Sequence, residues 1–448
     1  MSLREDALAI WQAGLSAVDS VAAVRRSIIA TPDSLVIGDT ELDPRHPGRL
    51  VVLGAGKAGA GMAAGIEQAL QKTPLFEHLS GWVNVPADCL LPLQKIHLHP
   101  ARPPGRNEPT PAVVAGTNEI LQRARHLQPN DVCLVVLSGG GSALLCSPAH
   151  GISLEDKLHV TRLLSASGAP IQELNLVRTQ LSQVKGGRLA NACRCSTLIT
   201  LVISDVIGDP LETIGSGPTF PAPNRSAEAL RILHDRGLWK QIPATVQNHL
   251  QNAASTSQPT QTASQTPPRT HHKIVASNSI ALAAAAAKAR TLGYELLPIL
   301  HDLRGEAADA GRYFLDRLRH SPPGRKTCLL GGGETTVNVS SAGHAAGRGG
   351  RNQEFVLAAA VASPNPNHWH NQLILSGGTD GEDGPTPAAG AWCDAHVLNS
   401  AKQQNLSLED FLRRHDSYTL FQQSNGLLIT GPTQTNVMDL AVGLATPP

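Results

Sequence analysis

Aromatic residues are scarce in this chain, which has only six Phe, five Trp and three Tyr among its 448 residues. The core must therefore be built mainly from Ala, Leu and Val, which pack closely between helices and sheets. Glycine, in contrast, is abundant, with 41 residues. Because glycine permits tight turns and close backbone approach to a ligand, this composition predicts a fold with many sharp turns.

The chain also lacks an excess of charge of either sign, since Lys and Arg number 37 and Asp and Glu number 36. Such a balance produces no long-range field that would attract nucleic acid or an acidic membrane surface. We therefore expect small-molecule ligands and neither nucleic-acid nor membrane partners. The sequence leaves the oligomeric state open, a homodimer included.

Long apolar runs are absent too, because Gly, Pro or a charged residue interrupts every candidate for 18 apolar residues. The first twenty residues combine acidic side chains with helical periodicity, which does not describe a signal peptide. The seven cysteines are an odd number scattered along a long chain, so they predict no disulfide framework. The lone C-x-C pair, Cys193 and Cys195, does not predict a zinc site. We expect reduced thiols, buried in strands at Cys133 and Cys328, in a cytoplasmic protein.

What dominates the sequence is a short apolar strand followed by a glycine-rich turn and then a helix. Helical spacing or composition marks the segments Ala58–Gln71, Asp156–Ser167, Gln172–Gln183, Ser279–Leu292 and Asn352–Val361. The strands are Leu50–Leu53, Val132–Leu137, Leu198–Ile203, Cys328–Leu330 and Leu373–Leu375. This alternation predicts an α/β fold in which largely parallel sheets are flanked by helices.

One stretch, residues 253–270, has a different composition, AASTSQPTQTASQTPPRT. It contains almost nothing apolar beyond Ala and cannot bury enough surface to offset its ordering entropy. We interpret it as a flexible polar linker or insertion. It would separate a Rossmann-like N-terminal domain, residues 1–252, from a C-terminal α/β domain, residues 271–448.

The first glycine turn, from Gly54 through Gly56 and Lys57 to Gly59, matches the dinucleotide fingerprint G-x-G-x-x-G between a strand and a helix. Two features disfavour a dinucleotide. The turn projects the cation Lys57, and the acid expected about 20 residues later is missing, since Asp88 comes late. A lysine here is suited to neutralising a transferring phosphate or a substrate carboxylate.

Further turns carry the groups that bind phosphate. The backbone of a glycine turn and the following helix N-terminus make a good anion site. We assign nucleotide or phosphate binding to the turn after Val132–Leu137, to the K-G-G-R segment that we expect to end a helix, and to the G-G-G-E-T-T turn. The residues are Gly54, Gly56, Ser138, Gly139, Gly140, Gly141, Ser142, Lys185, Gly332 and Glu334.

Acidic and cationic side chains complete the predicted site. Asp205 follows a strand, where a single carboxylate is well placed to hold Mg²⁺ together with substrate phosphates. Arg351 precedes a helix, and its planar guanidinium suits a phosphate or carboxylate. We expect Asn352, Asp380 and Asp383 to line the substrate or metal.

The motifs taken together resemble the class II glycerate kinases, whose C-terminal part is the MOFRL domain, here about residues 325–440. The resemblance runs from about residue 5 to 443. It rests on the motifs VVLGAGKAG, VVLSGGGSALL, ELNLVRTQLSQVKGGRLA, LVISDVIGDPLETIGSGPT, LLGGGETTV, GRGGRNQE, SGGTDGEDGPTPAAGA and TGPTQTN. The segment Arg102–Asn107 departs from the H-P-x-P-D pattern of many members.

The resemblance implies ATP-dependent phosphorylation of D-glycerate to 2-phosphoglycerate, with Mg²⁺, in a cleft between two α/β domains. It also implies that Lys57 and Arg351 are the functional lysine and arginine. We expect direct in-line transfer in which both cations neutralise the phosphoryl group and Asp205 binds Mg²⁺ or accepts the hydroxyl proton. Two alternatives remain: an NAD(P)-dependent hydroxypyruvate reductase and a non-catalytic sugar-phosphate-binding regulator.

Overall fold

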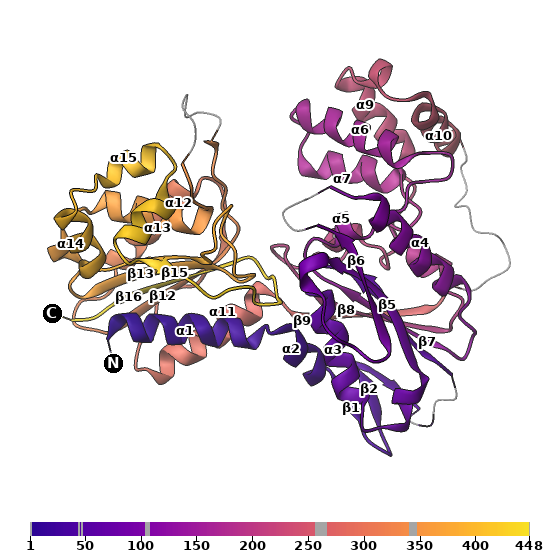
Figure 1. The fold of residues 1–448 in the computed structure, drawn as a ribbon, viewed down its shortest axis with the longest axis horizontal. Helices are drawn as coiled ribbons and strands as arrows, with labels where there is room; N and C mark the ends of the chain where they lie inside the picture. The colour runs from indigo at the N-terminus through magenta and orange to yellow at the C-terminus, as the bar shows by residue number, and fades with distance from the viewer. Residues whose placement is uncertain are drawn as a thin grey trace. The chain divides into compact units, whose positions relative to one another are not determined.

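The structure is a computed structural model that describes residues 2–43, 45, 48–103, 108–255, 267–339 and 347–447. Its chain divides into two compact units (Figure 1). The parallel-sheet unit comprises Ser20–Ile203 and Asp209–Val275. The mixed-sheet unit comprises Met1–Asp19, Ser204–Gly208 and Ala276–Pro448.

This division differs from the contiguous domains expected from the sequence. The first helix, α1 (Leu3–Ala17), packs with α11 (Asn278–Thr291) of the C-terminal half, because its apolar residues complete the core there. Of the predicted linker, residues 253–255 end helix α10 and Arg269 begins strand β9, whereas residues 256–266 lie outside the described residues. Residues 104–107 of the departing motif also lie outside them.

Six strands form the sheet of the parallel-sheet unit, in the order β6-β5-β4-β7-β8-β9. They are β4 (Leu50–Ala55), β5 (Leu79–Pro86), β6 (Ile96–Arg102), β7 (Val132–Leu137), β8 (Thr197–Ile203) and β9 (Arg269–Ala276). The strands β4 to β8 pair with one another in parallel. Counted along the chain, this is the order 3-2-1-4-5-6 of Rossmann folds, and its switch point lies between β4 and β7. The Rossmann-like prediction is thus confirmed.

Helices cover both faces of this sheet, which explains why β4 and β7 are buried along their whole length. On one face α3 (Gly59–Leu70) lies beside α2 (Ser20–Arg26), and on the other α4 (Pro111–Arg125) packs with α8 (Arg188–Ala192). A small antiparallel sheet, β1 (Ile28–Ala30), β2 (Leu35–Ile37) and β3 (Thr40–Leu42), completes this end of the chain.

Two long crossovers add a separate group of helices to the same unit (Figure 1). The connection from β7 to β8 supplies α5 (Gly141–Leu144), α6 (Leu154–Ala166) and α7 (Ile171–Gln180), and the connection from β8 to β9 supplies α9 (Ser226–Asp235) and α10 (Ala244–Ser255). All but α5 share an apolar core of their own, built on residues such as Val160, Val177 and Leu233.

The sheet of the mixed-sheet unit has the order β10-β12-β16-β13-β14-β15, with β11 also pairing to β12. Its strands are β10 (Glu295–Leu296), β11 (Leu300–Leu303), β12 (Thr327–Gly333), β13 (Gln372–Gly378), β14 (Gly390–Cys393), β15 (Leu427–Leu428) and β16 (Asp439–Ala445). Here the expectation of a largely parallel sheet is wrong. The last strand, β16, runs antiparallel between β12 and β13. Among the described strands of this sheet, only β10 and β11 pair in parallel, each with β12.

That insertion has a consequence for the turns. Gly333 at the end of β12 and Gly378 at the end of β13 both pair with Asp439, the first residue of β16. Two glycine turns and one carboxylate therefore meet at the same edge of this sheet.

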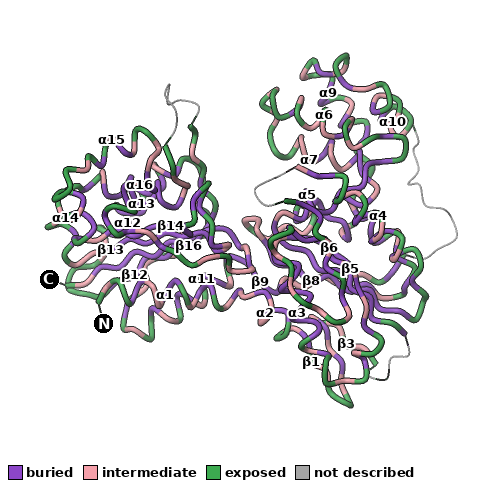
Figure 2. Tube along the Cα trace, in the orientation of Figure 1, coloured by how far each residue is buried: buried purple, intermediate pink, exposed green. Residues whose placement is uncertain are grey.

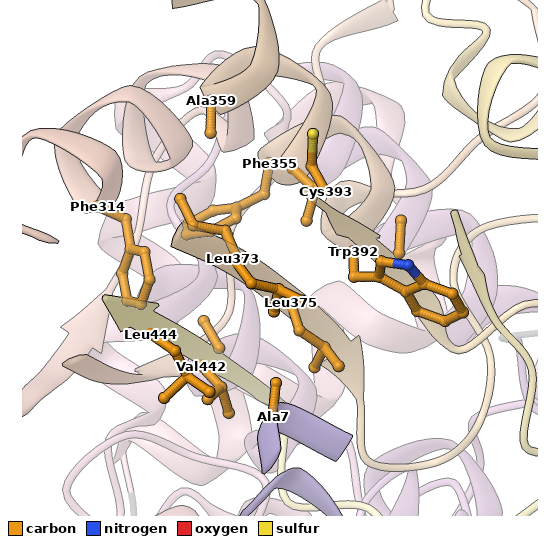
Figure 3. Close-up of a cluster of buried hydrophobic side chains, with 14 of the residues drawn as sticks. Ala7, Phe314, Phe355, Ala359, Leu373, Leu375, Trp392, Cys393, Val442 and Leu444 are labelled. Atoms are coloured by element: carbon orange, nitrogen blue, oxygen red, sulfur yellow. The ribbon is translucent and has the colours of Figure 1, made fainter. Parts of the chain in front are cut away.

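Helices also flank the mixed sheet on both faces, α1 and α11 on one and α12 (Ala307–Arg319) and α13 (Arg351–Ala362) on the other (Figure 1). Figure 3 shows Ala7 of α1 and Phe355 of α13 on opposite sides of Leu375. The rings of Phe314 and Phe355 pack edge to face, with 5.4 Å between their centroids. In Figure 2 the central strands of this sheet are buried, β12, β14 and β16 along their whole length. The border strands β10 and β11 and the outer helices α14 (Ala395–Gln403) and α15 (Leu408–Arg413) have exposed residues.

Among the described residues, no single helix is long and apolar enough to cross a membrane, although α1 and α2 would reach that length and composition if they were counted together.

Candidate functional site

The turns after β4 and β7 contact each other at the switch point of the parallel sheet. The backbone N–H of Lys57 donates to the carbonyl of Gly139 at 2.8 Å, and that of Ala58 donates to Ser138 Oγ at 3.0 Å. Ligands of open α/β sheets bind beyond the carboxyl ends of the strands at this point. The half-buried Lys57 thus lies where the topology favours a ligand.

Glycine is required where these turns meet. Gly54 and Gly56 have φ values of +156° and +149°. A Cβ on Gly54 would lie 2.0 Å from Val136 O in the neighbouring strand β7, and a Cβ on Gly56 would lie 2.0 Å from Ser138 Oγ in the turn after β7. In the structure, Gly54 therefore serves the close pairing of β4 with β7, and Gly56 serves the contact between the two turns. Their assignment to phosphate binding stays a prediction.

The backbone donors of the first turn are occupied by the protein itself. The N–H groups of Lys57 and Ala58 are used as described above, that of Gly56 donates to Asn84 O at 3.2 Å, and that of Gly59 donates to Gly56 O at 3.1 Å. A dinucleotide would place its pyrophosphate on donors of this turn. The hydrogen bonding therefore disfavours a dinucleotide despite the fingerprint.

Ser142 and Lys185, which are 43 residues apart in the chain, form a second contact in the same unit. Lys185 Nζ donates to Ser142 Oγ at 2.8 Å and to Ser142 O at 3.0 Å, and it lies 3.2 Å from Ser216 Oγ. Burial, reinforced by the charges of Arg178 and Lys157, lowers the pKa of Lys185 well below its ordinary value. The expectation that Lys185 ends a helix is wrong, because α7 ends at Gln180 and a turn carries Lys185.

Asp205 lies directly after β8, as the sequence predicted, and is half-buried. Its segment, Ser204–Gly208, belongs to the mixed-sheet unit. Among the described residues, no group of three or more His, Cys, Asp or Glu side chains is arranged to hold a metal ion. A single carboxylate nevertheless fits Mg²⁺, which takes one or two carboxylates and completes its shell with water and substrate phosphates.

In the mixed-sheet unit, Arg351 is the first residue of α13 and is held by two carboxylates. Its Nε and Nη2 donate to the two oxygens of Asp439 at 2.6 and 3.0 Å, and its Nη1 donates to Glu334 at 2.8 Å. Burial alone would lower the pKa of Arg351, but the charges of Asp439 and Glu334 and the hydrogen bond with Asp439 raise it. The guanidinium is therefore permanently charged and fixed in orientation.

Asp383 accepts the N–H groups at the beginning of α13, from Asn352 at 3.0 Å and from Gln353 at 2.9 Å. The Asn352 side chain also donates to Asp383 and Asp439 and accepts from Ser376 Oγ at 2.6 Å. Burial raises the pKa of Asp383 to about 7, although the hydrogen bonds from α13 act in the opposite direction. Arg351 and Asn352 are thus locked by a network of buried polar groups.

Gly332 and Asp380 were also predicted to belong to the site. Gly332 is inside β12, and a Cβ there would lie 1.8 Å from Asn278 Oδ1, so this glycine makes room for the Asn278 side chain. Asp380 lies in the turn after β13, where its carboxylate accepts the N–H of Glu382 at 3.2 Å. Their functional roles stay predictions.

Asp439 was missed by the sequence reasoning. The signal was present, since Asp439 opens the apolar run DLAVGLA, but that run was not recognised as a strand. Had it been, the rule that places ligand-binding carboxylates at strand ends would have included this residue.

The geometry can now be compared with known proteins. A family described as Domain of unknown function (DUF4147) matches residues 6–251, and the MOFRL family matches residues 327–439. Over 453 residues the chain is 34% identical to "Glycerate 2-kinase" of Pyrococcus horikoshii, covering 100% of this chain and 98% of that protein. The chain belongs to the class II glycerate kinase family. Its membership explains why the strand–turn motifs recur in both units.

Other relatives give the same result for the family. "Glycerate kinase" of Homo sapiens is 34% identical, with 98% of this chain and 92% of the human protein covered. The crystal structure of glycerate kinase from Thermotoga maritima superposes with a TM-score of 0.81 at 30% identity, and 99% of each chain is covered. A protein of Agrobacterium vitis with 36% identity, covering 92% of this chain and 91% of its own, bears the name "Putative hydroxypyruvate reductase".

Proposed function

We propose that this member of the glycerate kinase family transfers the γ-phosphate of ATP to D-glycerate and produces 2-phosphoglycerate and ADP. The observation that carries the proposal is the similarity over the whole chain to a relative named "Glycerate 2-kinase". The chemistry of the candidate site supports it. Phosphoryl transfer depends mainly on positioning and charge neutralisation, and the proposed residues include Lys57 on a turn after a strand and the oriented guanidinium of Arg351 at the beginning of α13.

Lys57 and Arg351 would neutralise the transferring phosphoryl group and orient the glycerate carboxylate by direct in-line transfer, without a phosphoenzyme. The turn from Ser138 to Ser142, with Lys185, would bind nucleotide phosphate. Asn352 and Asp383 would hold the beginning of α13 rigid, so that Arg351 keeps its orientation during turnover. Glu334 already contacts Arg351 and would share it with substrate.

Mg²⁺ would be held by Asp205 and substrate phosphates, where it would neutralise charge that develops on the phosphoryl oxygens. If Asp205 instead accepts the proton of the glycerate hydroxyl, the Asp205→Asn variant loses turnover at every Mg²⁺ concentration. If it holds the metal, raising Mg²⁺ restores part of that turnover.

The decisive test is ³¹P NMR of a reaction that contains the purified chain, ATP, Mg²⁺ and D-glycerate. The proposal expects ADP together with the resonance of 2-phosphoglycerate. A resonance of 3-phosphoglycerate would correct the regiochemistry, and the absence of any phosphoglycerate would contradict the proposal.

A hydroxypyruvate reductase is the second candidate, because a relative bears that name and the strand order is that of dinucleotide-binding folds. The occupied donors of the Gly54–Gly59 turn argue against it. Incubation with hydroxypyruvate and NADH or NADPH distinguishes the two functions, since only a reductase consumes the reduced nicotinamide. A non-catalytic regulator would be stabilised by sugar phosphates without turnover.

A further inference from the structure

Four cationic side chains gather where α7 ends in the parallel-sheet unit. They are Lys157, Arg178, Lys185 and Arg188. All four donate hydrogen bonds to acceptors between Ser142 and Ser216 in the chain. None of these four cations forms an ion pair with a carboxylate of the described residues. The residues that the structure does not describe include no Asp or Glu. A concentration of buried positive charge without acidic partners is costly, because each desolvated ion loses several kcal/mol of hydration.

Two of these cations have an internal explanation. Lys157 Nζ donates to the carbonyl of Leu181 at 2.8 Å and to that of Arg178 at 3.3 Å. Arg188 Nη1 donates to the carbonyls of Thr179 at 2.7 Å and Lys185 at 3.1 Å. Both satisfy carbonyls at the end of α7, where the helix dipole favours positive charge.

Arg178 and Lys185 differ from these two because, besides other neutral acceptors, both donate to one hydroxyl. The other acceptors are Asn175 Oδ1 for Arg178 and the carbonyls of Ser142 and Gly215 for Lys185. Arg178 Nη2 lies 3.2 Å and Lys185 Nζ lies 2.8 Å from Ser142 Oγ, which is also 3.1 Å from Ser216 Oγ. A hydroxyl dipole does not compensate two ions. Burial lowers the pKa of Arg178 and of Lys185, which is the direction expected for cations that lack an anion.

The adjacent glycine turn supplies further donors. Within the described residues, the backbone N–H groups of Gly139 and Gly140 donate to no acceptor, whereas that of Gly141 donates to Ser138. Gly140 has φ +73°, and a Cβ built on it would have a single neighbour within 4 Å among the described residues, Lys57 Cγ at 3.5 Å, so this side of the turn is open with respect to them. Guanidinium, ammonium and backbone N–H groups are all donors and match only an acceptor-rich, negatively charged ligand.

We propose that Arg178, together with Lys185 and Ser142, forms an oxyanion subsite that receives a phosphate or carboxylate group of a substrate. The inference rests on the proposed function for the identity of the substrates and adds Arg178, which the motif analysis left without a role. Both the phosphate chain of the nucleotide and the carboxylate of glycerate supply the anionic oxygens that such a subsite would bind. Binding experiments distinguish these two ligands.

The test compares Arg178→Met with the matched control Arg162→Met, whose arginine lies on the neighbouring helix α6 and forms an exposed ion pair with Glu108 at 2.7 Å. Isothermal titration measures binding of a non-hydrolysable ATP analogue and, separately, of D-glycerate, at constant ionic strength. We expect Arg178→Met to weaken one of the two ligands at least about tenfold and Arg162→Met to weaken neither. Loss of the analogue assigns the phosphate chain to the subsite, and loss of glycerate assigns the carboxylate.

Unchanged binding of both ligands to folded Arg178→Met overturns the inference. If that variant does not fold, Ser142→Ala is titrated in its place under the same criterion. If neither variant folds, the melting temperature of the wild-type chain is measured in inorganic phosphate and in chloride of equal ionic strength. The subsite predicts a higher melting temperature in phosphate, and equal melting temperatures would overturn the inference. Binding is read without turnover, so a wild-type chain that fails to phosphorylate glycerate contradicts the proposed function and leaves the subsite standing. If the wild-type chain phosphorylates glycerate and Arg178→Met binds both ligands normally, the proposed function stands and the subsite is contradicted.

Discussion

Arg351 and Asp439 form a two-pronged ion pair in which Nε and Nη2 of the guanidinium donate to the two carboxylate oxygens. The pair joins the beginning of α13 to the beginning of β16, 88 residues away in the chain. A guanidinium held in this way can rotate little, so its remaining nitrogen points in a fixed direction, here toward Glu334. The arrangement suggests that orientation, beyond charge alone, is what Arg351 contributes.

Replacing Arg351 by Lys tests that suggestion, since an ammonium keeps the charge but loses the fork. We expect kcat to fall at least about a hundredfold, the loss typical for removal of one preorganised donor. Steady-state assay of ADP release measures the change. The matched control is Arg348→Lys in the same segment, whose side chain lies over the Tyr418 ring and which should retain wild-type kcat. Equal activity of Arg351→Lys and wild type would exclude Arg351 from the site.

Asp439→Asn removes the partner and leaves Arg351 in place. Because the amide offers one acceptor where the carboxylate offers two, the free energy of unfolding should fall by about 1–3 kcal/mol, measured by urea denaturation. We also expect kcat to fall while KM changes less, since Arg351 loses its orientation and not its charge. Asp410→Asn serves as control, because Asp410 pairs with Arg414 at the surface, where such pairs contribute little. Identical stability of the two variants would contradict the role of Asp439.

Lys57 is the cation of the other unit, and its role is tested by Lys57→Met. We expect a loss of about 10²–10³ in kcat with little change in stability, because the side chain is half-buried and the turn is held by its backbone. The control Lys72→Met changes an exposed lysine just beyond the same helix, α3. Wild-type turnover by a folded Lys57→Met variant would remove Lys57 from the mechanism.

Three strands of the parallel-sheet unit, β4, β7 and β8, were predictable because they contain continuous apolar runs followed by turns with glycine. The strands β6 (IHLHPAR) and β9 (RTHHKIVA) have no such pattern. The apolar run Val132–Leu137 even coincides with β7 from end to end. Local sequence also located Lys57, Asp205 and Arg351 at the ends of strands or the beginning of a helix. These signals are short-range, so a single sequence reveals them.

What the sequence did not reveal depends on pairing between distant segments. The antiparallel insertion of β16 between β12 and β13 is invisible locally, and with it the position of Asp439 opposite Gly333 and Gly378. The same holds for α1, which leaves the N-terminal half to complete the core of the other unit. Arg178 was visible in a motif, but its lack of an acidic partner emerges only from the packing around Ser142.

Two glycines with positive φ provide a matched test of the close pairing between β4 and β7. In Gly54→Ala the new methyl group would lie 2.0 Å from the Val136 carbonyl oxygen, whereas at Gly168, with φ +70°, no atom of the described residues lies within 4 Å of it. Gly168→Ala should therefore cost only the backbone strain, about 1–2 kcal/mol. Gly54→Ala adds overpacking in a buried strand and should cost at least about 3 kcal/mol. Chemical denaturation of both variants measures the difference, and similar losses would show that β4 and β7 can separate at this position without penalty.

Lys157 provides the pH test. Burial lowers the pKa of its ammonium to about 8, below the 10.5 of the unfolded chain, so between these values the unfolded state holds more of the proton. The contribution of this group to stability is therefore present in full above about pH 10.5 and is lost as the pH falls through 8. Since one pKa unit corresponds to about 1.4 kcal/mol, the free energy of unfolding should rise by up to about 3 kcal/mol across this range through Lys157.

Other groups titrate in the same interval, so the measured quantity is the difference between the wild-type chain and Lys157→Met. The variant should show a flatter dependence of unfolding free energy on pH between 8 and 10.5, and the exposed Lys240→Met should follow the wild-type curve. Because Lys157 also satisfies the carbonyls of Arg178 and Leu181, its loss should lower stability at pH 7 as well. If the pH dependence of the unfolding free energy is the same for wild type and Lys157→Met, burial does not lower the pKa of the Lys157 ammonium as expected. That outcome would also weaken the argument that the cations at the end of α7 lack compensating negative charge.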